Sequence, residues 1–158
     1  MEFKIEKELT TIPNINALLS DQERQARRML MDKIIEDGRP VYPSDYTEDK
    51  LIQCLDSKGV IARNGDGLVT VVYPVSAMPT PHKVKLKDGR SFYSICAIDS
   101  LGSAFAFEQD ITVTSSCSYC HRQVYVAIEN GEISSFDPEG VLVTHTDLAG
   151  EVNWAGTC

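Results

Sequence analysis

Apolar residues recur at three- and four-residue spacing in the first third of the chain, a pattern that predicts an amphipathic helix over 21–37. Its apolar positions are Ala26, Met29, Leu30 and Ile34. Ser20 followed by Glu23 forms a capping-box pattern at the start, and Gly38 supplies the stop. A second helix is predicted over 47–57, and its apolar side consists of Tyr46, Leu51, Cys54 and Leu55. Cys54 is therefore expected in the core.

Strand patterns dominate after the second helix. Two β-rich runs, 60–63 and 68–73, flank the turn sequence Asn64–Gly67 and predict a hairpin. Further strands are predicted at 84–90, 92–98, 111–115, 124–129, 133–136 and 141–145. A short helix is expected over 101–107, with Asp99 and Ser100 at its N-cap. The fold class is α+β, with an α-helical N-terminal half and a β-rich C-terminal half.

Two helices followed by a hairpin resemble a winged-helix module. The common function of such modules is DNA binding, in which the second helix reads the DNA. Here that helix carries Glu48, Asp49 and Asp56 against Lys50 alone. We therefore prefer a winged-helix module that serves packing over one that binds nucleic acid.

The charge distribution also argues against nucleic-acid binding. The 158 residues include 15 Lys and Arg and 23 Asp and Glu, a formal charge of −8. Residues 1–91 hold 14 acidic and 14 basic side chains, whereas residues 92–158 hold 9 acidic side chains and only Arg122. The C-terminal part should repel nucleic acid. The sequence Met1–Glu6 has no apolar signal region, and no apolar run reaches the roughly 20 residues of a membrane span, so we expect a cytoplasmic chain with no membrane partner.

Five cysteines is an odd number, which excludes a fully paired disulfide framework within one chain. Cys96 and Asp99 lie three residues apart where a predicted strand meets a predicted helix, so one helical turn would place thiol and carboxylate on one face. Amide groups at a helix start favour a thiolate. The alternative is a buried apolar cysteine beside an N-cap aspartate.

The sequence Cys117-Ser118-Tyr119-Cys120-His121 fits three motifs: c-type haem attachment, half of a zinc site, and a redox dithiol. Haem attachment requires an exported chain. A zinc site needs further ligands, which His82, His145 or Cys54 would have to supply. A redox motif of the thioredoxin type opens a helix, whereas a strand is predicted from Val124. A tight turn with structural or idle cysteines is the preferred interpretation, with a zinc knuckle as the alternative.

The C-terminal half resembles the organomercurial lyases, also called alkylmercury lyases. The residues that carry the resemblance are 92–101 (FYSICAIDSL), the strand and Ser-x-Cys ending at 111–117, the strand at 124–128, and 137–141 (DPEGV). Residues 38–41 (GRPV) and the winged-helix pattern match the family's N-terminal half. The resemblance covers roughly residues 38–158.

The resemblance implies a pair of cysteines and an aspartate that act on a carbon–mercury bond. Cys96 and Asp99 match the family's motif directly, and Cys158 is the candidate for the second catalytic cysteine. Cys117 matches a cysteine of structural role, and Cys120 and His121 have no counterpart. Phe92, Phe105, Phe107 and Trp154 are candidate walls of an apolar pocket, although a plain core role also explains each of them.

The implied reaction is protonolysis, which gives a hydrocarbon and Hg(II) held by Cys96, Asp99 and Cys158 with no required cofactor. The implied partners are an organomercurial substrate and a mercury-accepting thiol or reductase. The expected organisation is an N-terminal arm (1–18), a winged-helix-like module (19–80) and a lyase-like core (81–158) that ends short of the family's C-terminal elements. The competing hypothesis is a non-enzymatic soft-metal-binding or metal-responsive regulatory protein on the same scaffold. A weaker one is a zinc-stabilised transcription factor.

Overall fold

The computed structural model describes residues 15–46 and 49–144 and has an α+β architecture. Its α-helices are α1 (Asp21–Asp37), α2 (Asp49–Ser57) and α3 (Ala97–Phe107). Its strands are β1 (Ile61–Arg63), β2 (Val69–Val72), β3 (Val75–Ser76), β4 (His82–Leu86), β5 (Ser91–Ser94), β6 (Ile111–Ser116), β7 (Gln123–Glu129) and β8 (Glu132–Asp137). Within the described residues, no helix is long and apolar enough to cross a bilayer.

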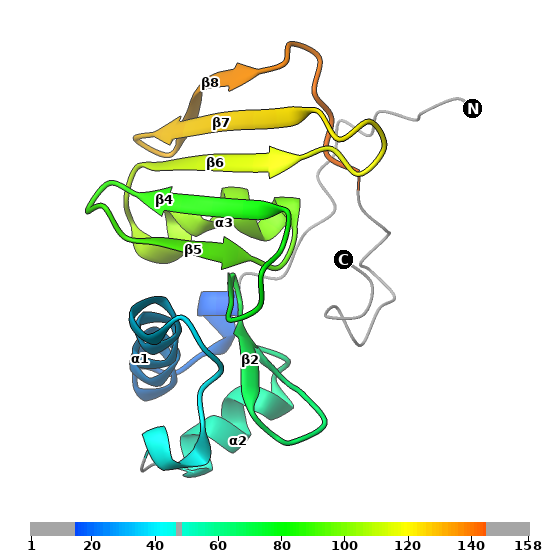
Figure 1. Ribbon diagram of the computed structural model, residues 1–158. Helices are drawn as coiled ribbons and strands as arrows, with labels where there is room; N and C mark the ends of the chain where they lie inside the picture. Colours follow the sequence, from blue (N-terminus) through cyan, green and yellow to red (C-terminus); the bar gives the residue numbers. More distant parts are fainter. Residues whose placement is uncertain (1–14, 47–48, 145–158) are drawn as a thin grey trace.

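The eight strands form one antiparallel sheet in the order β1-β2-β3-β5-β4-β6-β7-β8. The N-terminal hairpin joins the larger C-terminal part of the sheet through β3, because Val75 pairs with Ser94 and Ser76 with Tyr93. In Figure 1, β2 runs upright beside α1 and α2, whereas β4 to β8 lie across the view above them. One hydrogen-bonded sheet therefore connects the helical N-terminal half to the β-rich C-terminal half.

Helix α1 begins and ends at the predicted signals. The Ser20 Oγ accepts the Glu23 amide at 3.3 Å, and a Glu23 carboxylate oxygen accepts the Ser20 amide at 2.7 Å, so the capping box is confirmed. Gly38 ends the helix with φ 63°, a left-handed conformation that glycine adopts without steric cost. The buried face differs in part from the prediction, because Met29 is 47% exposed while Arg27 and Met31 are buried.

Helix α2 buries a different stripe from the predicted one. Ile52 and Leu55 are its buried residues, and they face the core shared with α1. Cys54 is exposed, so its predicted core position is wrong. The physical reason is angular: each residue turns a helix by about 100°, so Cys54 lies well away from the stripe that Ile52 and Leu55 define.

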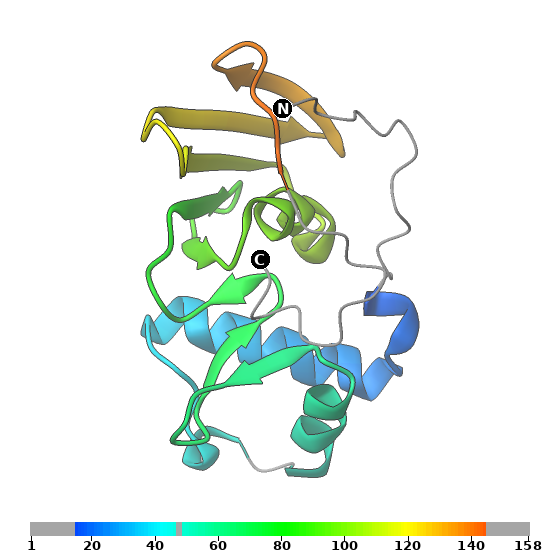
Figure 2. The ribbon, with the colours of Figure 1, turned by 90° about the vertical axis from the view of Figure 1, so that its right-hand side faces the viewer.

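Helix α3 covers one face of the sheet, over β4, β5 and β6. Figure 2 shows it nearly end-on beneath β6 to β8, with α1 running below. Strand residues alternate accordingly: Val84, Phe92 and Val113 are buried on the helix side, whereas Lys83 and Tyr93 are exposed on the other. The side chains of Phe92 and Phe107 pack with ring centroids 5.2 Å apart, which fixes α3 against the sheet.

Most of the predicted strands are confirmed, but the one predicted over 92–98 ends at Ser94 because α3 begins at Ala97, and one is wrong. The Asn64–Gly67 hairpin forms, and the Asn64 side chain accepts the amides of Asp66 and Leu68 at 3.1 and 3.0 Å. The strand predicted over 141–145 is absent from 141–144, where the chain has no regular structure. Apolar β-branched residues do not form a strand without a pairing partner, because the backbone groups then gain nothing over water. Residue 145 lies outside the described residues.

Candidate functional site

Cys96 lies at the N-terminus of α3, directly after the strand that leads into it. Its backbone is extended (φ −148°, ψ 176°), and its sulfur accepts the backbone amide of Asp99 at 3.5 Å. Cys96 is therefore the N-cap, and the helix starts at Ala97, two residues before the predicted Asp99–Ser100 cap. The sulfur replaces the usual hydroxyl or carboxylate oxygen as the acceptor for a free amide of the first turn. This position favours the thiolate form of a cysteine.

Asp99 completes a thiol–carboxylate pair with Cys96. The Cys96 thiol donates to the Asp99 Oδ2 over 3.2 Å, as the three-residue spacing predicts. Burial raises the pKa of Asp99, and the hydrogen bond from Cys96 and the charge of Arg27 act against this rise. A carboxyl with a raised pKa beside a thiol is suited to accept a proton and to pass it on.

Arg27, which was not among the predicted site residues, is a buried cation near this pair. Its Nε and Nη2 both donate to the Tyr73 carbonyl at 3.0 and 2.6 Å, and its Nη1 donates to Asn16 Oδ1 at 2.6 Å. Burial lowers the pKa of Arg27, while the charge of Asp99 raises it. Helix α1 therefore supplies a fixed positive charge that favours the ionised form of Asp99. The signal in the sequence is an arginine at an apolar-face position, between Glu23 and Leu30.

The first turns of α3 are rigidly held. The Ser100 amide donates to the Cys96 carbonyl at 2.9 Å, and the Ser103 hydroxyl donates to the Asp99 carbonyl at 2.9 Å. Ser100 and Ser103 are both buried. These local hydrogen bonds hold the helix backbone that carries Cys96 and Asp99, which preserves the spacing of the pair.

Among the candidate pocket walls, Phe92 and Phe107 are buried in the core, whereas Phe105 is 63% exposed. Trp154 lies outside the described residues, as do His145 and the predicted catalytic Cys158. The structure therefore brings together two of the three predicted catalytic residues, Cys96 and Asp99.

The remaining predicted ligands are spread over the fold. His82 on β4 bonds through Nδ1 to the Ser115 hydroxyl of β6 at 2.8 Å, and burial lowers its pKa. Cys117 and Cys120 lie in the loop between β6 and β7, and Cys54 lies on the exposed side of α2. Across residues 15–46 and 49–144, no group of three His, Cys, Asp or Glu side chains is placed to hold a metal ion. The described residues thus supply no third ligand for the zinc interpretation.

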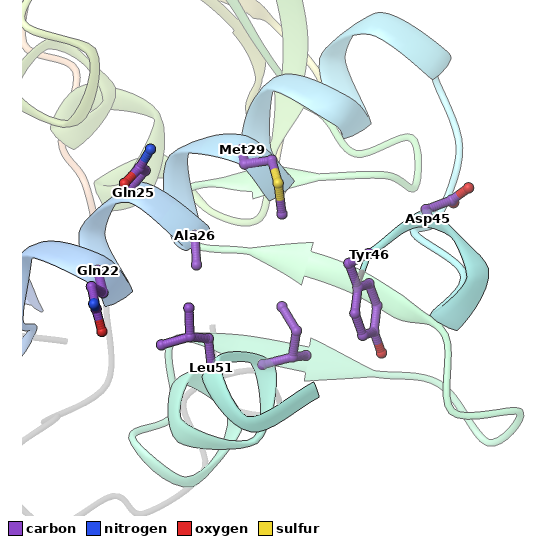
Figure 3. A pocket seen from close by; sticks show the side chains of 8 residues that line it. Gln22, Gln25, Ala26, Met29, Asp45, Tyr46 and Leu51 are labelled. Carbon is purple, nitrogen blue, oxygen red and sulfur yellow. The ribbon is translucent and has the colours of Figure 1, made fainter. Parts of the chain in front are cut away.

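A cavity of about 450 Å³ separates α1 from α2 and is distinct from the Cys96–Asp99 pair. Figure 3 shows Ala26, Met29 and Leu51 directed toward it, with Gln22 and Gln25 along α1. Asp45 lies at one end and is held by Arg39, whose Nη1 donates to it at 2.8 Å. This lining has no nucleophile and no free acid–base pair, so the cavity offers no chemistry of its own.

The chain is similar in sequence to proteins of one family. The family model "MerB: Alkylmercury lyase" matches residues 75–158, more than half of the chain and the part that contains Cys96 and Asp99. An alkylmercury lyase of Staphylococcus epidermidis is 25% identical over 118 residues, which are 71% of this chain and 54% of the relative. An alkylmercury lyase of Streptomyces lividans is 26% identical over 150 residues, which are 86% of this chain and 64% of the relative. The chain thus spans between half and two thirds of the length of these curated relatives.

A solved structure has a similar fold. The crystal structure of the mercury-bound form of MerB2 superposes with a TM-score of 0.57 at 23% identity, covering 78% of this chain and 63% of that chain. The family-model match and the two curated relatives agree with the resemblance carried by the Cys96–Asp99 segment. The chain belongs to the alkylmercury lyase family.

Proposed function

We propose that this protein cleaves carbon–mercury bonds by protonolysis and yields a hydrocarbon and Hg(II). The observation that carries the proposal is the 3.2 Å hydrogen bond between the Cys96 thiol and Asp99 Oδ2, at the N-terminus of α3 and inside the segment matched by the family model. A site that only bound metal would need the thiol but no adjacent proton carrier. The pairing of a soft nucleophile with a carboxyl favours a reaction that transfers a proton.

The residue types suit the substrate. Mercury(II) is a soft cation that prefers thiolate to carboxylate or amine ligands. In the proposed first step, the Cys96 sulfur bonds to the mercury of R–Hg–X and X leaves as an anion, while the thiol proton passes to Asp99. The Cys158 sulfur then bonds to the same mercury, and its proton is released to solvent, where it and the departed X⁻ together make up H–X.

The carbon–mercury bond breaks in the last step. Asp99 donates its proton to the carbon, the electron pair of the carbon–mercury bond forms the new carbon–hydrogen bond, and Hg(II) stays on Cys96, Cys158 and an Asp99 oxygen. One R–Hg–X and two thiols thus give R–H, H–X and one bis-thiolate Hg(II). Mercury has the +2 state before and after, so the reaction requires neither oxidant nor reductant, and we propose that no cofactor takes part.

The surroundings of Asp99 fit both halves of its role. Burial raises the pKa of this carboxyl, which favours holding a proton, whereas the charge of Arg27 favours the ionised form that accepts one. A group that first accepts and then donates a proton works best when these influences are balanced. Arg27 is a positioning residue in this proposal, since it acts through Asp99.

The remaining features are proposed on the same basis. The helices α1 and α2 with the β1–β2 hairpin support a winged-helix-like module over 19–80, after an arm over 1–18 and before the lyase core over 81–158. The acidic face of α2 supports a packing role for this module rather than nucleic-acid binding. Hg(II) is thiophilic, so its acceptor is proposed to be a small thiol or the cysteine pair of a reductase.

The test is to incubate the protein with methylmercury chloride and excess glutathione, and to measure methane in the headspace and Hg(II) in solution. We expect product from the unaltered chain, and a loss of at least about a hundredfold in rate for Cys96→Ser and Asp99→Asn. Cys54→Ser is the matched control, because this exposed thiol on α2 lies outside the pair and its loss should leave the rate unchanged.

Two outcomes contradict the proposal. One is equal methane release by the two site variants and the unaltered chain. The other is retention of methylmercury without methane release, which would instead support the non-enzymatic soft-metal-binding protein.

A further inference from the structure

Two cysteines that the proposed lyase reaction does not use lie together in the loop between β6 and β7. Cys117 is half-buried and Cys120 is exposed, and both are free thiols. The loop projects from the long antiparallel pair β6–β7, whose last register position joins Ser116 to Gln123. Both cysteines are therefore at least partly exposed and are carried by a firmly paired hairpin.

Hydrogen bonds fix the loop at both ends. The Cys117 amide donates to the Arg122 carbonyl at 2.9 Å, and the His121 amide donates to the Cys117 carbonyl at 2.9 Å. The Ser116 hydroxyl donates to the His121 carbonyl at 3.3 Å. His121 has φ 57°, the left-handed conformation that turns the chain back toward β7. This geometry orders the loop before any ligand arrives.

Cys117 and Cys120 belong to one turn of this loop, which the His121 amide closes onto the Cys117 carbonyl at 2.9 Å. Hydrogen bonding from the backbone amides of Cys120 and Tyr119 and from the Cys120 side chain lowers the pKa of the Cys117 thiol, because these donors stabilise the negative charge of a thiolate. The two thiols are therefore neighbours within the same turn.

We propose that Cys117 and Cys120 form a second thiol site that binds one thiophilic cation between their two sulfurs, and that this cation is Hg(II). The identity of the cation rests on the proposed function, because the lyase reaction would release Hg(II) on the same molecule. Two thiolates are sufficient ligands for Hg(II), which accepts linear coordination by two sulfurs. Zinc prefers four ligands, and the described part of the chain offers no third His, Cys, Asp or Glu beside this pair.

The site has a chemical role beside the reaction centre. Mercury held by Cys96 and Cys158 blocks the next turnover until another thiol removes it. An exposed dithiol on the same chain can accept this cation by ligand exchange, in which one mercury–sulfur bond forms as another breaks and the proton of the entering thiol passes to the leaving one. The two thiols then present the cation at the surface to an external acceptor.

The test uses the full chain with Cys54, Cys96 and Cys158 all replaced by Ser, so that Cys117 and Cys120 are the remaining thiols. The reduced protein is loaded with one equivalent of HgCl2 and dialysed against excess glutathione, and bound mercury is measured by mass spectrometry of the intact protein. We expect one retained mercury per chain. Adding Cys120→Ser should lower retention at least about tenfold, because the second sulfur then no longer binds intramolecularly. X-ray absorption at the mercury edge should show two sulfur neighbours.

A chain that keeps Cys54 as its single thiol is the matched control, because Cys54 is also exposed but has no partner cysteine in the sequence nearby. Retention equal to that of this control would overturn the proposal. So would a disulfide between Cys117 and Cys120 that persists in excess glutathione and excludes mercury. Since the parent chain lacks Cys96, the result is independent of carbon–mercury cleavage, and failure of the lyase assay would leave it unaffected.

Discussion

The coupling between Arg27 on α1 and Asp99 on α3 can be measured through Arg27→Met. This change keeps much of the hydrocarbon volume of the side chain and removes the charge and the three hydrogen bonds to Tyr73 and Asn16. It also removes the positive charge that lowers the pKa of Asp99. We therefore expect two separate effects: a loss of stability from the missing hydrogen bonds, and a further rise in the pKa of Asp99.

The size of the first effect follows from the contacts. Hydrogen bonds that involve a charged group contribute about 1.5–3 kcal/mol each, and two of the three bonds of Arg27 share one carbonyl acceptor. Part of this contribution is offset because the guanidinium itself is buried, as the lowered pKa of Arg27 reflects. We expect Arg27→Met to lower the free energy of unfolding by about 2–4 kcal/mol, measured as a shift in the urea midpoint at constant slope.

The second effect has a defined sign and pH window. Because the folded-state pKa of Asp99 is raised above 3.8, ionised Asp99 destabilises the fold once the pH exceeds that value, and fully so above the folded pKa. Arg27 reduces this penalty at neutral pH, so Arg27→Met should cost more when Asp99 is present than in an Asp99→Asn background. The interaction energy of the double-mutant cycle should lie at about 0.5–3 kcal/mol at neutral pH and decline as acid protonates Asp99.

Additivity of the two changes within about 0.5 kcal/mol at neutral pH would refute this reasoning. Arg27 would then support only the backbone around Tyr73. Arg27→Lys serves as the charge-conserving control: it keeps the cation but cannot form the two-nitrogen contact with the Tyr73 carbonyl. This variant should retain most of the coupling to Asp99 while losing stability.

Three further predictions concern stability. The Lys58 ammonium, 2.7 Å from Glu23, lowers the pKa of that carboxyl to about 2, so its contribution is present above pH 4.5 and lost as the pH falls toward 2. Glu23→Gln should therefore flatten the acid limb of a urea-midpoint profile, and an unchanged limb would contradict the assignment. Burial lowers the pKa of His82, so the native state favours the neutral ring and should lose stability as the pH falls below 6.5. His82→Gln should remove that dependence in thermal unfolding, whereas persistence of the full dependence would show that another group is responsible. Leu30→Ala at a fully buried position should cost about 2–5 kcal/mol, and a cost under about 1 kcal/mol would mean that the core closes around the gap.

Local signals explain most of what could be predicted from the sequence. The Ser20–Glu23 capping box and the Asn64–Gly67 turn form as predicted, because their hydrogen bonds join residues only a few positions apart. The pairing of Cys96 with Asp99 belongs to the same class, since one helical turn determines it. The spacing of these two residues and their position at a strand–helix junction are enough to predict that they pair.

The errors arose where tertiary packing decides between equivalent local patterns. Cys54 and Ile52 both fit an apolar stripe on α2, and only the position of α1 selects Ile52 and Leu55 for burial. Residues 141–144 have the composition of a strand but pair with no other strand in the described part of the chain, and they are irregular. A sequence pattern states what a segment can bury or pair, and the neighbouring elements determine whether it does so.

The candidate site likewise combines residues that are close in the sequence with one that tertiary packing brings near them. Cys96 and Asp99 supply the reactive atoms and are near neighbours in sequence, whereas Arg27 is 72 residues before Asp99 and acts on it through the packing of α1 and α3 against one sheet. The pairing of β3 with β5 makes this possible, because it ties the strand next to α1 to the strand that leads into Cys96. If the electrostatic balance of Asp99 depends on that connection, the N-terminal helices contribute to the reaction although they contain none of its proposed catalytic residues. A C-terminal fragment with Cys96 and Asp99 but without α1 would then keep the thiol–carboxylate pair and lose the charge that favours its ionised form.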